Sequence, residues 1–321
     1  MKKVKLFEQF ISEQDAKNKD LFKVCLVYDP DYGHRFWSYK DYSTDKFFVK
    51  LTPEEYKKNK DVDKSLPVLN YNADFTQKLI DDGKIDPKNV YNLPDAVKQS
   101  NKDNFHKLMD GTPWVPKTCH DSKKATKDIG FPMIAKPSEG HSGEGITVLK
   151  NQKEFDAADH SKLDVYSEYI DKTEEHRFFV FKGKIWFWQE RTPTNDKAKT
   201  GKGDSDERMM FDYKRKKLEG LPEDYQKVSD EVSKIFKDLP YLCLDMMKDK
   251  AGKVYVIETN AMPGVPFDST VEAYKLIFKD FYNREPNKEC CDELQKCADH
   301  MNKKTIDGYR KYDKGRFSVE K

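Results

Sequence analysis

The fold is decided by the stretch Tyr241-Leu-Cys-Leu-Asp-Met-Met-Lys-Asp-Lys-Ala-Gly-Lys-Val-Tyr-Val-Ile-Glu-Thr-Asn-Ala-Met-Pro-Gly264. Its first half alternates hydrophobic residues with other types, as a strand with one buried face does. Asp249-Lys-Ala-Gly252 has the composition of a tight turn. Residues 253–260 are rich in β-branched and aromatic side chains, which favour a second strand. The stretch is therefore predicted to form a β-hairpin.

Three polar side chains converge on one face of this predicted hairpin. With the turn centred on residues 250–251, Asp245 lies opposite Val256. Side chains alternate between the two faces of a strand, so Val256, Glu258 and Asn260 share a face with Asp245. Glu258 is then the diagonal neighbour of Asp245, roughly 7–8 Å away. Two carboxylates and an amide oxygen are thus predicted at one end of the hairpin.

This set of side chains has the chemistry of a divalent-cation site. Neighbouring carboxylates repel each other unless a cation or a proton lies between them. All three donors are oxygen atoms, without His or Cys alongside, which suits Mg²⁺ or Mn²⁺ held partly by substrate phosphates and does not suit Zn²⁺. A solvent-facing hairpin with acidic positions is the alternative. Asn260 and the stiff Met262-Pro263-Gly264 turn favour the cation site.

Composition bounds the class of protein. The chain of 321 residues is long enough for two or three domains with sizeable cores. Its 59 Lys and Arg residues against 57 Asp and Glu residues leave a net charge near zero, which gives no indication of a nucleic-acid or membrane partner. The sequence contains no signal-peptide pattern and no run that approaches a membrane span. A cytoplasmic protein is expected, as a monomer or an oligomer.

The six cysteines indicate a reduced protein. Cys25 and Cys243 lie within apolar strand patterns and are expected to be buried as small hydrophobic side chains. Cys290 and Cys297 share a helical stripe with hydrophobic residues, which favours core packing. A metal site with His300 is the alternative, but no Cys-x-x-Cys pair accompanies it.

Strands and helices alternate in the first hundred residues. This rhythm indicates a small α/β domain with a mostly parallel sheet. One helix start is well marked, because Thr52-Pro-Glu-Glu55 forms a capping box with Pro at the first helical position. The predicted strands are residues 21–28, 46–51, 67–71 and 90–91. One predicted helix begins at residue 53, and a second spans about residues 73–82.

The remainder of the chain mixes hairpins with helices. A long helix is predicted over residues 93–109. Residues 192–217 have little apolar pattern, so they are predicted to form a long loop with one strand at 208–213, and a loop of this length is usually functional. The other predicted strands are residues 131–136, 146–149, 164–170, 176–181 and 184–191, and a helix at 221–239 leads into the hairpin.

A loop rich in glycine and serine follows an apolar strand that ends at Lys136. Glycines allow the backbone to approach a ligand closely, so successive N–H groups can hold phosphate oxygens, and the lysine adds a positive charge. The loop joins two strands, and the chain lacks a G-x-x-x-x-G-K-[ST] pattern, so neither a dinucleotide fingerprint nor a P-loop is supported. A flexible hairpin tip is the alternative. The candidate phosphate contacts in the loop are Ser138, Gly140, Ser142 and Gly143.

From about residue 90 to 280 the sequence resembles the ATP-grasp superfamily of carboxylate–amine ligases, such as ribosomal-protein glutamate ligases, D-alanine–D-alanine ligases and glutathione synthetases. The motifs keep the family's order: Asn101-Lys-Asp103, Phe131-Pro-Met-Ile-Ala-Lys-Pro137, Tyr166-Ser-Glu-Tyr-Ile170, and then the hairpin. The resemblance implies an α/β (α+β) protein with the ATP-grasp fold. Its expected parts are a small parallel α/β domain at 1–98, a central lid subdomain at 99–171, a C-terminal antiparallel-sheet subdomain with the metal site at 172–285, and a helix and tail at 286–321.

The resemblance also implies which residues bind ATP. Lys102 and Lys136 are expected to contact the nucleotide phosphates, and the loop after Lys136 is expected to cover them. Lys102 alone would be a lysine on a helix surface, and the ordered set of motifs carries the resemblance. The expected contacts to adenine and ribose are Glu168, the backbone of Tyr169 and Ile170, and Glu175.

The metal site and its arginines are implied in the same way. Arg191 and Lys136 are the expected catalytic residues, because Arg191 matches an arginine that usually faces phosphate or the acyl intermediate, with Arg177 as a second candidate. Some relatives carry an arginine two residues before the metal aspartate, where this chain has Cys243. The group that stabilises the oxyanion is therefore open between Arg191 and loop N–H groups. The family's metal ligands match Asp245, Glu258 and Asn260, and Glu258 is expected to bridge two Mg²⁺ ions.

The function implied by the resemblance is an ATP-dependent ligase. It would join the carboxylate of a small molecule or peptide to an amine acceptor through an acyl-phosphate, releasing ADP and phosphate. The N-terminal domain and the 192–217 loop usually shape the acceptor site, and the N-terminal domain matches only in its rhythm of strands and helices, so the substrates are not implied. A kinase acting on a small-molecule hydroxyl and a non-catalytic ATP-binding regulatory protein are the alternatives.

Overall fold

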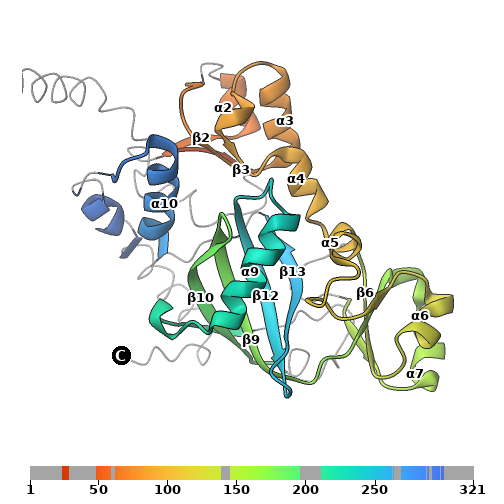
Figure 1. Cartoon of the computed structure of the whole chain (residues 1–321). Coiled ribbons are helices and arrows are strands. Elements are labelled where there is room, and N and C mark those ends of the chain that lie inside the picture. The colour runs from red at the N-terminus through yellow and green to blue at the C-terminus, as the bar shows by residue number, and fades with distance from the viewer. Residues whose placement is uncertain are drawn as a thin grey trace, which may run out of the picture. The chain divides into compact units, whose positions relative to one another are not determined.

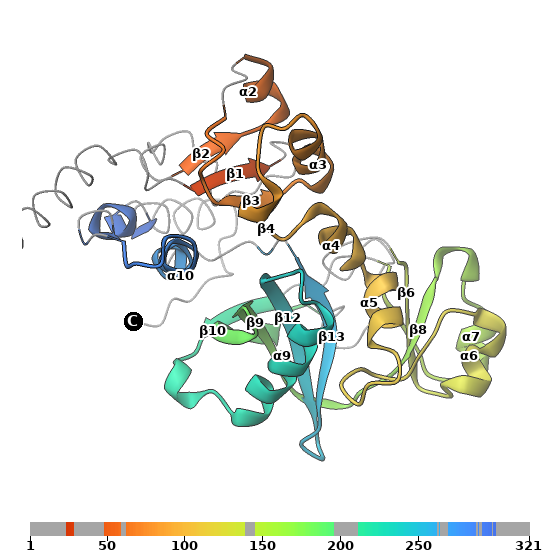
Figure 2. The same cartoon turned by 45° about the horizontal axis from the view of Figure 1, so that its top comes forward.

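The structure is a computed structural model of the chain, and its elements are labelled in Figure 1 and Figure 2. It divides into two compact units, residues 1–94 with 264–321 and residues 95–263. The domain boundaries expected at residues 98/99, 171/172 and 285/286 stay predictions. Among the described helices, none has the length and apolar composition that a membrane crossing requires. The structure describes residues 24–28, 48–58, 62–138, 145–195, 211–261, 263, 269–286, 288, 291–296 and 298–299.

The first unit contains a four-stranded parallel sheet, as the alternation of strands and helices predicts. Cys25 is fully buried in its core, and so is Leu79. The sheet order is β2-β1-β3-β4, with β1 at Val24–Tyr28, β2 at Phe48–Leu51, β3 at Val68–Tyr71 and β4 at Val90–Tyr91. The helices described in this unit include α2 (Pro53–Lys58), α3 (Ala73–Asp81), η3 (Pro87–Asn89) and α10 (Thr270–Tyr282).

Local hydrogen bonds confirm the helix starts in this unit. The Glu55 N–H donates to Thr52 Oγ1 at 3.1 Å, and the Thr52 N–H donates to Glu55 Oε2 at 3.0 Å, which is the predicted capping box. Asn72 caps α3 by accepting from the Phe75 N–H at 2.9 Å. These side chains satisfy N–H groups that a helix cannot satisfy by itself.

The second unit begins with a four-stranded antiparallel sheet in the order β5-β8-β6-β7. Both views show α6 and α7 beside this sheet. Its core includes Phe155 of α7, Ala125 of α6 and Tyr166 of the sheet. The strands are β5 (Thr118–Cys119), β6 (Met133–Lys136), β7 (Thr147–Leu149) and β8 (Val165–Glu168), and the helices are α6 (Ser122–Asp128), α7 (Gln152–Asp156) and η4 (His160–Lys162).

The single helix predicted at residues 93–109 is wrong, because the structure has two helices there. They are α4 (Pro94–Gln99) and α5 (Lys102–Met109). Asn101 has an extended backbone and accepts the Asn104 N–H at 2.9 Å, so it acts as the N-cap of α5. The break places Lys102 at the first position of α5.

The second unit also contains a five-stranded sheet in the order β11-β10-β9-β12-β13. Its antiparallel pairs confirm both predicted hairpins. The prediction of a loop over residues 192–217 is partly wrong, because β10 continues to Pro193 and pairs with β11. Residues 196–210 lie outside the described part of the chain. The strands are β9 (Lys172–Phe181), β10 (Lys184–Pro193), β11 (Phe211–Arg215), β12 (Tyr241–Asp249) and β13 (Val254–Asn260), and η5 (Leu218–Gly220) and α9 (Glu223–Ile235) lie between β11 and β12 in the chain.

Helix α9 covers one face of this sheet (Figure 1). Tyr225 of α9 packs against Phe178 with ring centroids 4.7 Å apart, and its hydroxyl lies 3.2 Å from His176 Nδ1. Side chains alternate along β9, so Arg177 projects from the opposite face. Asp245 pairs with Arg177 in the register and lies on that face too. The predicted site therefore occupies the face of the sheet that α9 leaves uncovered.

The register of the hairpin β12–β13 differs from the prediction. The turn holds three residues instead of two, with Gly252 in the left-handed region at φ 83° and the Asp249 N–H bonded to the Lys253 carbonyl at 3.0 Å. A β-bulge then follows, so that Met246 pairs with Val256 but Asp245 pairs with Glu258. Val256 therefore lies on the face opposite to Asp245, and Glu258 is the direct neighbour of Asp245, not its diagonal one.

Candidate functional site

Asp245 lies at the centre of a cluster of charged side chains on the face of the sheet opposite α9. It is 3% exposed. Arg177 donates to both of its oxygens, from Nε to Oδ1 at 2.7 Å and from Nη2 to Oδ2 at 2.8 Å. Arg191 donates from Nη1 to Oδ2 at 2.7 Å. Two guanidinium groups from the neighbouring strands β9 and β10 thus hold one buried carboxylate.

The cluster continues along β9 and β10. Arg191 Nη1 also lies 2.9 Å from Glu175 Oε1, and Lys172 forms an ion pair with the same carboxylate. The rings of Phe211 and Tyr213 on β11 complete it: Phe211 lies 4.2 Å from the Arg191 guanidinium carbon and Tyr213 lies 5.5 Å from that of Arg177.

The arginines keep Asp245 ionised despite its burial. Burial alone would raise the pKa of Asp245, but the charges of Arg177 and Arg191 and their hydrogen bonds outweigh it and leave this pKa well below its ordinary value. Burial likewise opposes the charge of Arg177, and Asp245 outweighs that effect and raises the pKa of Arg177. Cys243, in contrast, is buried, and burial raises the pKa of its thiol, so it stays neutral.

Asp245 and Glu258 fit a bridging cation. A carboxylate offers about four lone pairs; three of those on Asp245 accept arginine N–H groups, which leaves room for one further partner. Glu258 pairs directly with Asp245 across β12 and β13, and two carboxylates this close repel each other unless a proton or a cation lies between them, so a divalent cation could occupy that place. Asn260, two residues along the same strand and exposed, could supply a third oxygen. Within the described residues no group of three His, Cys, Asp or Glu side chains gathers at one point, so further ligands would have to come from the bound substrate.

The second predicted catalytic residue, Lys136, lies at the end of β6 and is 6% exposed. Its positive charge acts on His106 of α5, which is 3% exposed. Thr118 Oγ1 lies 3.5 Å from His106 Nδ1 and 3.1 Å from Ser167 Oγ on β8. His106 Nε2 is buried without a hydrogen-bond partner among the described residues. These contacts connect α5, which begins at Lys102, with β5, β6 and β8.

His106 should make the protein sensitive to mild acid. Burial, and then the charges of Lys136 and His120, lower the pKa of His106 to about 2. The unfolded chain binds a proton here below about pH 6.5 while the folded chain does not, so stability is lost as the pH falls below that value. We expect the free energy of unfolding to fall by about 2 kcal/mol between pH 7.5 and pH 5 because of this residue. His106→Gln should flatten the slope in urea titrations, and His120→Gln should leave it in place; a wild-type slope in His106→Gln would contradict the assignment.

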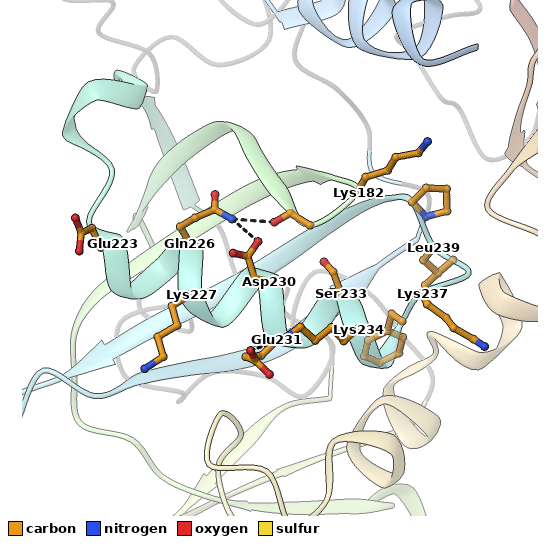
Figure 3. A pocket seen from close by; sticks show the side chains of 13 residues that line it. Lys182, Glu223, Gln226, Lys227, Asp230, Glu231, Ser233, Lys234, Lys237 and Leu239 are labelled. Carbon is orange, nitrogen blue, oxygen red and sulfur yellow. Dashed lines mark hydrogen bonds and ion pairs between the residues drawn. The ribbon is translucent and has the colours of Figure 1, made fainter. Parts of the chain in front are cut away.

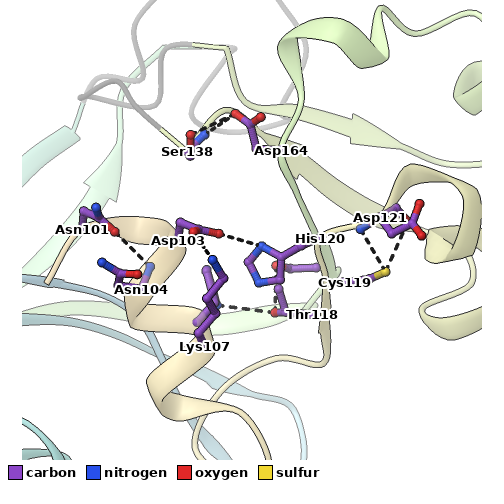
Figure 4. A network of polar contacts seen from close by, with 12 residues as sticks. Asn101, Asp103, Asn104, Lys107, Thr118, Cys119, His120, Asp121, Ser138 and Asp164 are labelled. Carbon is purple, nitrogen blue, oxygen red and sulfur yellow. Dashed lines mark hydrogen bonds and ion pairs between the residues drawn. The ribbon is translucent and has the colours of Figure 1, made fainter. Parts of the chain in front are cut away.

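The loop after Lys136 is described only at its start. The Ser138 N–H and hydroxyl both donate to Asp164 Oδ2, at 2.8 Å and 3.0 Å (Figure 4). The same figure shows Asp103 of α5 bound to Lys107 and, at 3.0 Å, to His120. The predicted phosphate contacts Gly140, Ser142 and Gly143, and the side chain of Lys102, lie outside the described residues.

The residues predicted at adenine lie at the end of β8. Glu168 is exposed, and its N–H donates to the Lys117 carbonyl at 2.9 Å. Tyr169 is 39% exposed and donates its N–H to the Pro132 carbonyl at 3.3 Å. Ile170 is buried against Met247. Glu175, predicted at ribose, is 9% exposed and binds Arg191 and Lys172, so the structure brings it into the charged cluster.

A protein-family model matches residues 86–264, which is more than half of the chain: its description is ATP-grasp domain, R2K clade family 3. The chain belongs to this ATP-grasp family. The match covers both antiparallel sheets, the hairpin β12–β13 and all of the predicted site residues. A search of curated proteins finds no match.

Solved structures of ATP-grasp proteins share the fold. D-alanine–D-alanine ligase from Bacillus anthracis is 18% identical and superposes with a TM-score of 0.57, over 87% of this chain and 99% of the ligase. N5-carboxyaminoimidazole ribonucleotide synthetase from Thermotoga maritima is 14% identical with a TM-score of 0.52, over 83% and 77%. The macrocyclase MdnC bound with precursor peptide MdnA, from Microcystis aeruginosa MRC, is 12% identical with a TM-score of 0.51, over 82% and 100%. The predicted ATP-grasp fold is confirmed.

Sequence reasoning missed two parts of this candidate site. His106 appeared as one polar residue in a predicted helix, and its burial follows from packing against β5 and β8, which the sequence pattern does not reveal. The aromatic cover of the arginines by Phe211 and Tyr213 was missed, although both residues lie in the strand predicted at 208–213, because the sequence does not show that this strand pairs with β10. The available signal was the alternating sequence Phe211-Asp-Tyr213, which places both rings on one face of a strand.

A cavity of about 820 Å³ lies elsewhere in this unit, along α9 and the β9–β10 turn (Figure 3). Gln226 lines it and donates to the Gly183 carbonyl at 2.9 Å and to Asp230 at 2.8 Å. None of the predicted site residues lines it. Its lining carries acids and lysines together, so it shows no preference for the charge of a ligand.

Proposed function

We propose that this protein is an ATP-dependent ligase that joins a carboxylate to an amine through an acyl-phosphate. One observation carries the proposal: in an ATP-grasp domain, Asp245 and Glu258 lie directly opposite each other on the face of the sheet away from α9, and Arg177 lies next to Asp245. Paired carboxylates can hold the cation of a nucleotide triphosphate, and the guanidinium beside them can hold an anionic substrate.

The proposed reaction has two steps. An oxygen of the substrate carboxylate forms a bond to the γ-phosphorus of ATP, the bond from that phosphorus to the β–γ bridging oxygen breaks, and ADP leaves with the electron pair. The amine nitrogen then attacks the acyl carbon, phosphate leaves with the electron pair of the C–O bond, and the amine releases a proton to solvent. Water must be kept away, because it would hydrolyse the acyl-phosphate.

The residues of the chain have separate parts in this proposal. Asp245, Glu258 and Asn260 would hold Mg²⁺ or Mn²⁺, one ion or two, which when bound neutralises charge on the phosphates. Lys136, and Lys102 at the start of α5, would meet the phosphates. The end of β8 at Glu168, Tyr169 and Ile170 would meet adenine, and Glu175 would meet ribose.

Detection of the products tests this function. We expect the purified protein, incubated with ATP, Mg²⁺ and a metabolite extract, to release ADP and inorganic phosphate and to form a product whose mass equals acid plus amine minus water, as read by mass spectrometry. A phosphorylated product without inorganic phosphate would show instead the kinase alternative. Tight ATP binding without turnover across a panel of carboxylates and amines would show the regulatory alternative.

A further inference from the structure

We propose that Arg177, and not Arg191, is the residue that meets the substrate carboxylate, and that Tyr213 selects a carboxylate with a flat apolar group beside it. The inference rests on the proposed ligase function. It reverses the assignment that the family resemblance implies, and it follows from how the two guanidinium groups are used in this structure.

Arg191 is a buried residue with a structural role. Its side chain is 12% exposed, and its Nη1 is divided between two buried carboxylates, Asp245 at 2.7 Å and Glu175 at 2.9 Å. Phe211 lies over its guanidinium at 4.2 Å. Arg191 Nε is completely buried and has no hydrogen-bond partner among the described residues, so no ligand reaches that edge while the ring stays in place. The charge of Arg191 is therefore committed to holding the strands together.

Arg177 is available to a ligand. Its side chain is 26% exposed, about twice as much as that of Arg191. It binds Asp245 through the edge formed by Nε and Nη2. This leaves Nη1 of the guanidinium, whose N–H groups have no hydrogen-bond partner in the described part of the chain. A planar fork of this kind matches the two oxygens of a carboxylate.

The strand register explains how Arg177 takes this place. Asp245 pairs directly with Arg177 across β12 and β9, and the position two residues before Asp245 is the buried Cys243. An arginine at position 243 would project from the same face as Asp245, one pair further along the strands. Arg177 supplies a guanidinium to that face from the next strand, while the neutral Cys243 packs with Phe179 and Phe187.

Charge and shape indicate the class of substrate. The edge of the Arg177 guanidinium that faces away from Asp245 combines a positive charge with N–H donors, and both favour an anionic ligand. Tyr213 stands 5.5 Å from the Arg177 guanidinium and is 43% exposed, so an anion at Arg177 lies next to an aromatic wall. A carboxylate that carries an aromatic or other flat apolar group fits both surfaces.

Titration with small carboxylates tests the proposal on the full chain. The probes are benzoate, which has a flat ring, and acetate, which lacks one, each titrated by calorimetry in the presence of ADP and Mg²⁺. We expect benzoate to bind roughly threefold to tenfold more tightly than acetate. Arg177→Gln should weaken both probes by about tenfold or more, and Tyr213→Ala should weaken benzoate alone.

The controls separate this inference from the fold and from the proposed function. Arg177→Gln removes two hydrogen bonds from the buried carboxylate of Asp245, so we expect a lower melting temperature, and binding is measured at a temperature at which circular dichroism shows a folded chain. Arg177→Lys, which keeps the charge but loses the fork, should bind both probes with intermediate affinity. Arg284→Gln, a matched loss of charge in the first unit, should change neither probe. Benzoate binding that is unaffected by Arg177→Gln would overturn the inference. A wild-type chain that binds benzoate through Arg177 but fails to bind ATP would instead refute the ligase function.

Discussion

Replacing Glu258 by Gln is expected to reduce ADP release, measured with the substrate pair found by mass spectrometry, by about 10³-fold. The amide keeps the size and the pairing opposite Asp245, so the fold should survive. It removes one of the two carboxylates that would hold a divalent cation, and a cation that neutralises phosphate charge is worth several kcal/mol to the transition state. Mn²⁺ binding in the presence of a non-hydrolysable ATP analogue, followed by electron paramagnetic resonance, should weaken in parallel.

Glu190→Gln is the matched control for this experiment. Glu190 lies on β10 of the same sheet and forms an ion pair with Lys216 at 2.5 Å, away from the Asp245 cluster. Its loss should leave ADP release within about twofold, since exposed pairs contribute little. Full ADP release by Glu258→Gln would show that Glu258 is not a cation ligand. A loss of activity together with a lowered melting temperature would point to a structural role instead.

The second large effect is on stability. Arg191→Ala is expected to lower the free energy of unfolding by about 3–5 kcal/mol, because it leaves the buried carboxylates of Asp245 and Glu175 short of a partner. Urea unfolding followed by tryptophan fluorescence measures this change, since Trp186 and Trp188 lie on β10 with Arg191. Loss of the cation contact with Phe211 should add a smaller amount.

Lys184→Ala provides the contrast. Lys184 starts β10 and pairs with Asp230 at 3.1 Å, but its side chain is 72% exposed, so its removal should cost less than about 1 kcal/mol. If Arg191→Ala and Lys184→Ala unfold at the same urea concentration, the cluster around Asp245 does not stabilise the sheet. A lower pH should narrow the difference between wild type and Arg191→Ala only below the ordinary pKa of an aspartate, because the arginines hold the pKa of Asp245 below that range.

The hairpin and the ATP-grasp fold could be predicted because their signals are local and ordered along the chain. Alternation marks β12 and β13, and Thr52 with Glu55 marks the start of α2. The pairing of Asp245 with Glu258 could not be predicted, because a three-residue turn and a bulge each shift the register by one position. A single residue more or less in a turn is decided by backbone energetics that composition does not resolve.

The contacts of the candidate site were harder to predict than its residues. The sequence indicated Asp245, Glu258, Arg191 and Lys136, but not that both arginines bind one carboxylate, since that contact joins residues 54 and 68 positions apart in the chain. Contacts across three adjacent strands depend on sheet order, which one sequence does not state. Gly140, Ser142 and Gly143 stay predictions, because they lie outside the described residues.

The bulge between β12 and β13 has a practical consequence for anyone who wishes to modify this protein. It separates the exposed turn at residues 250–252 from the carboxylate pair, since the hydrogen-bonded pairs from Lys248 to Met246 lie between them. A dye, a short epitope or a solid-phase linker inserted at that tip would meet water on its outer side. The tip is therefore a suitable point for attaching a reporter.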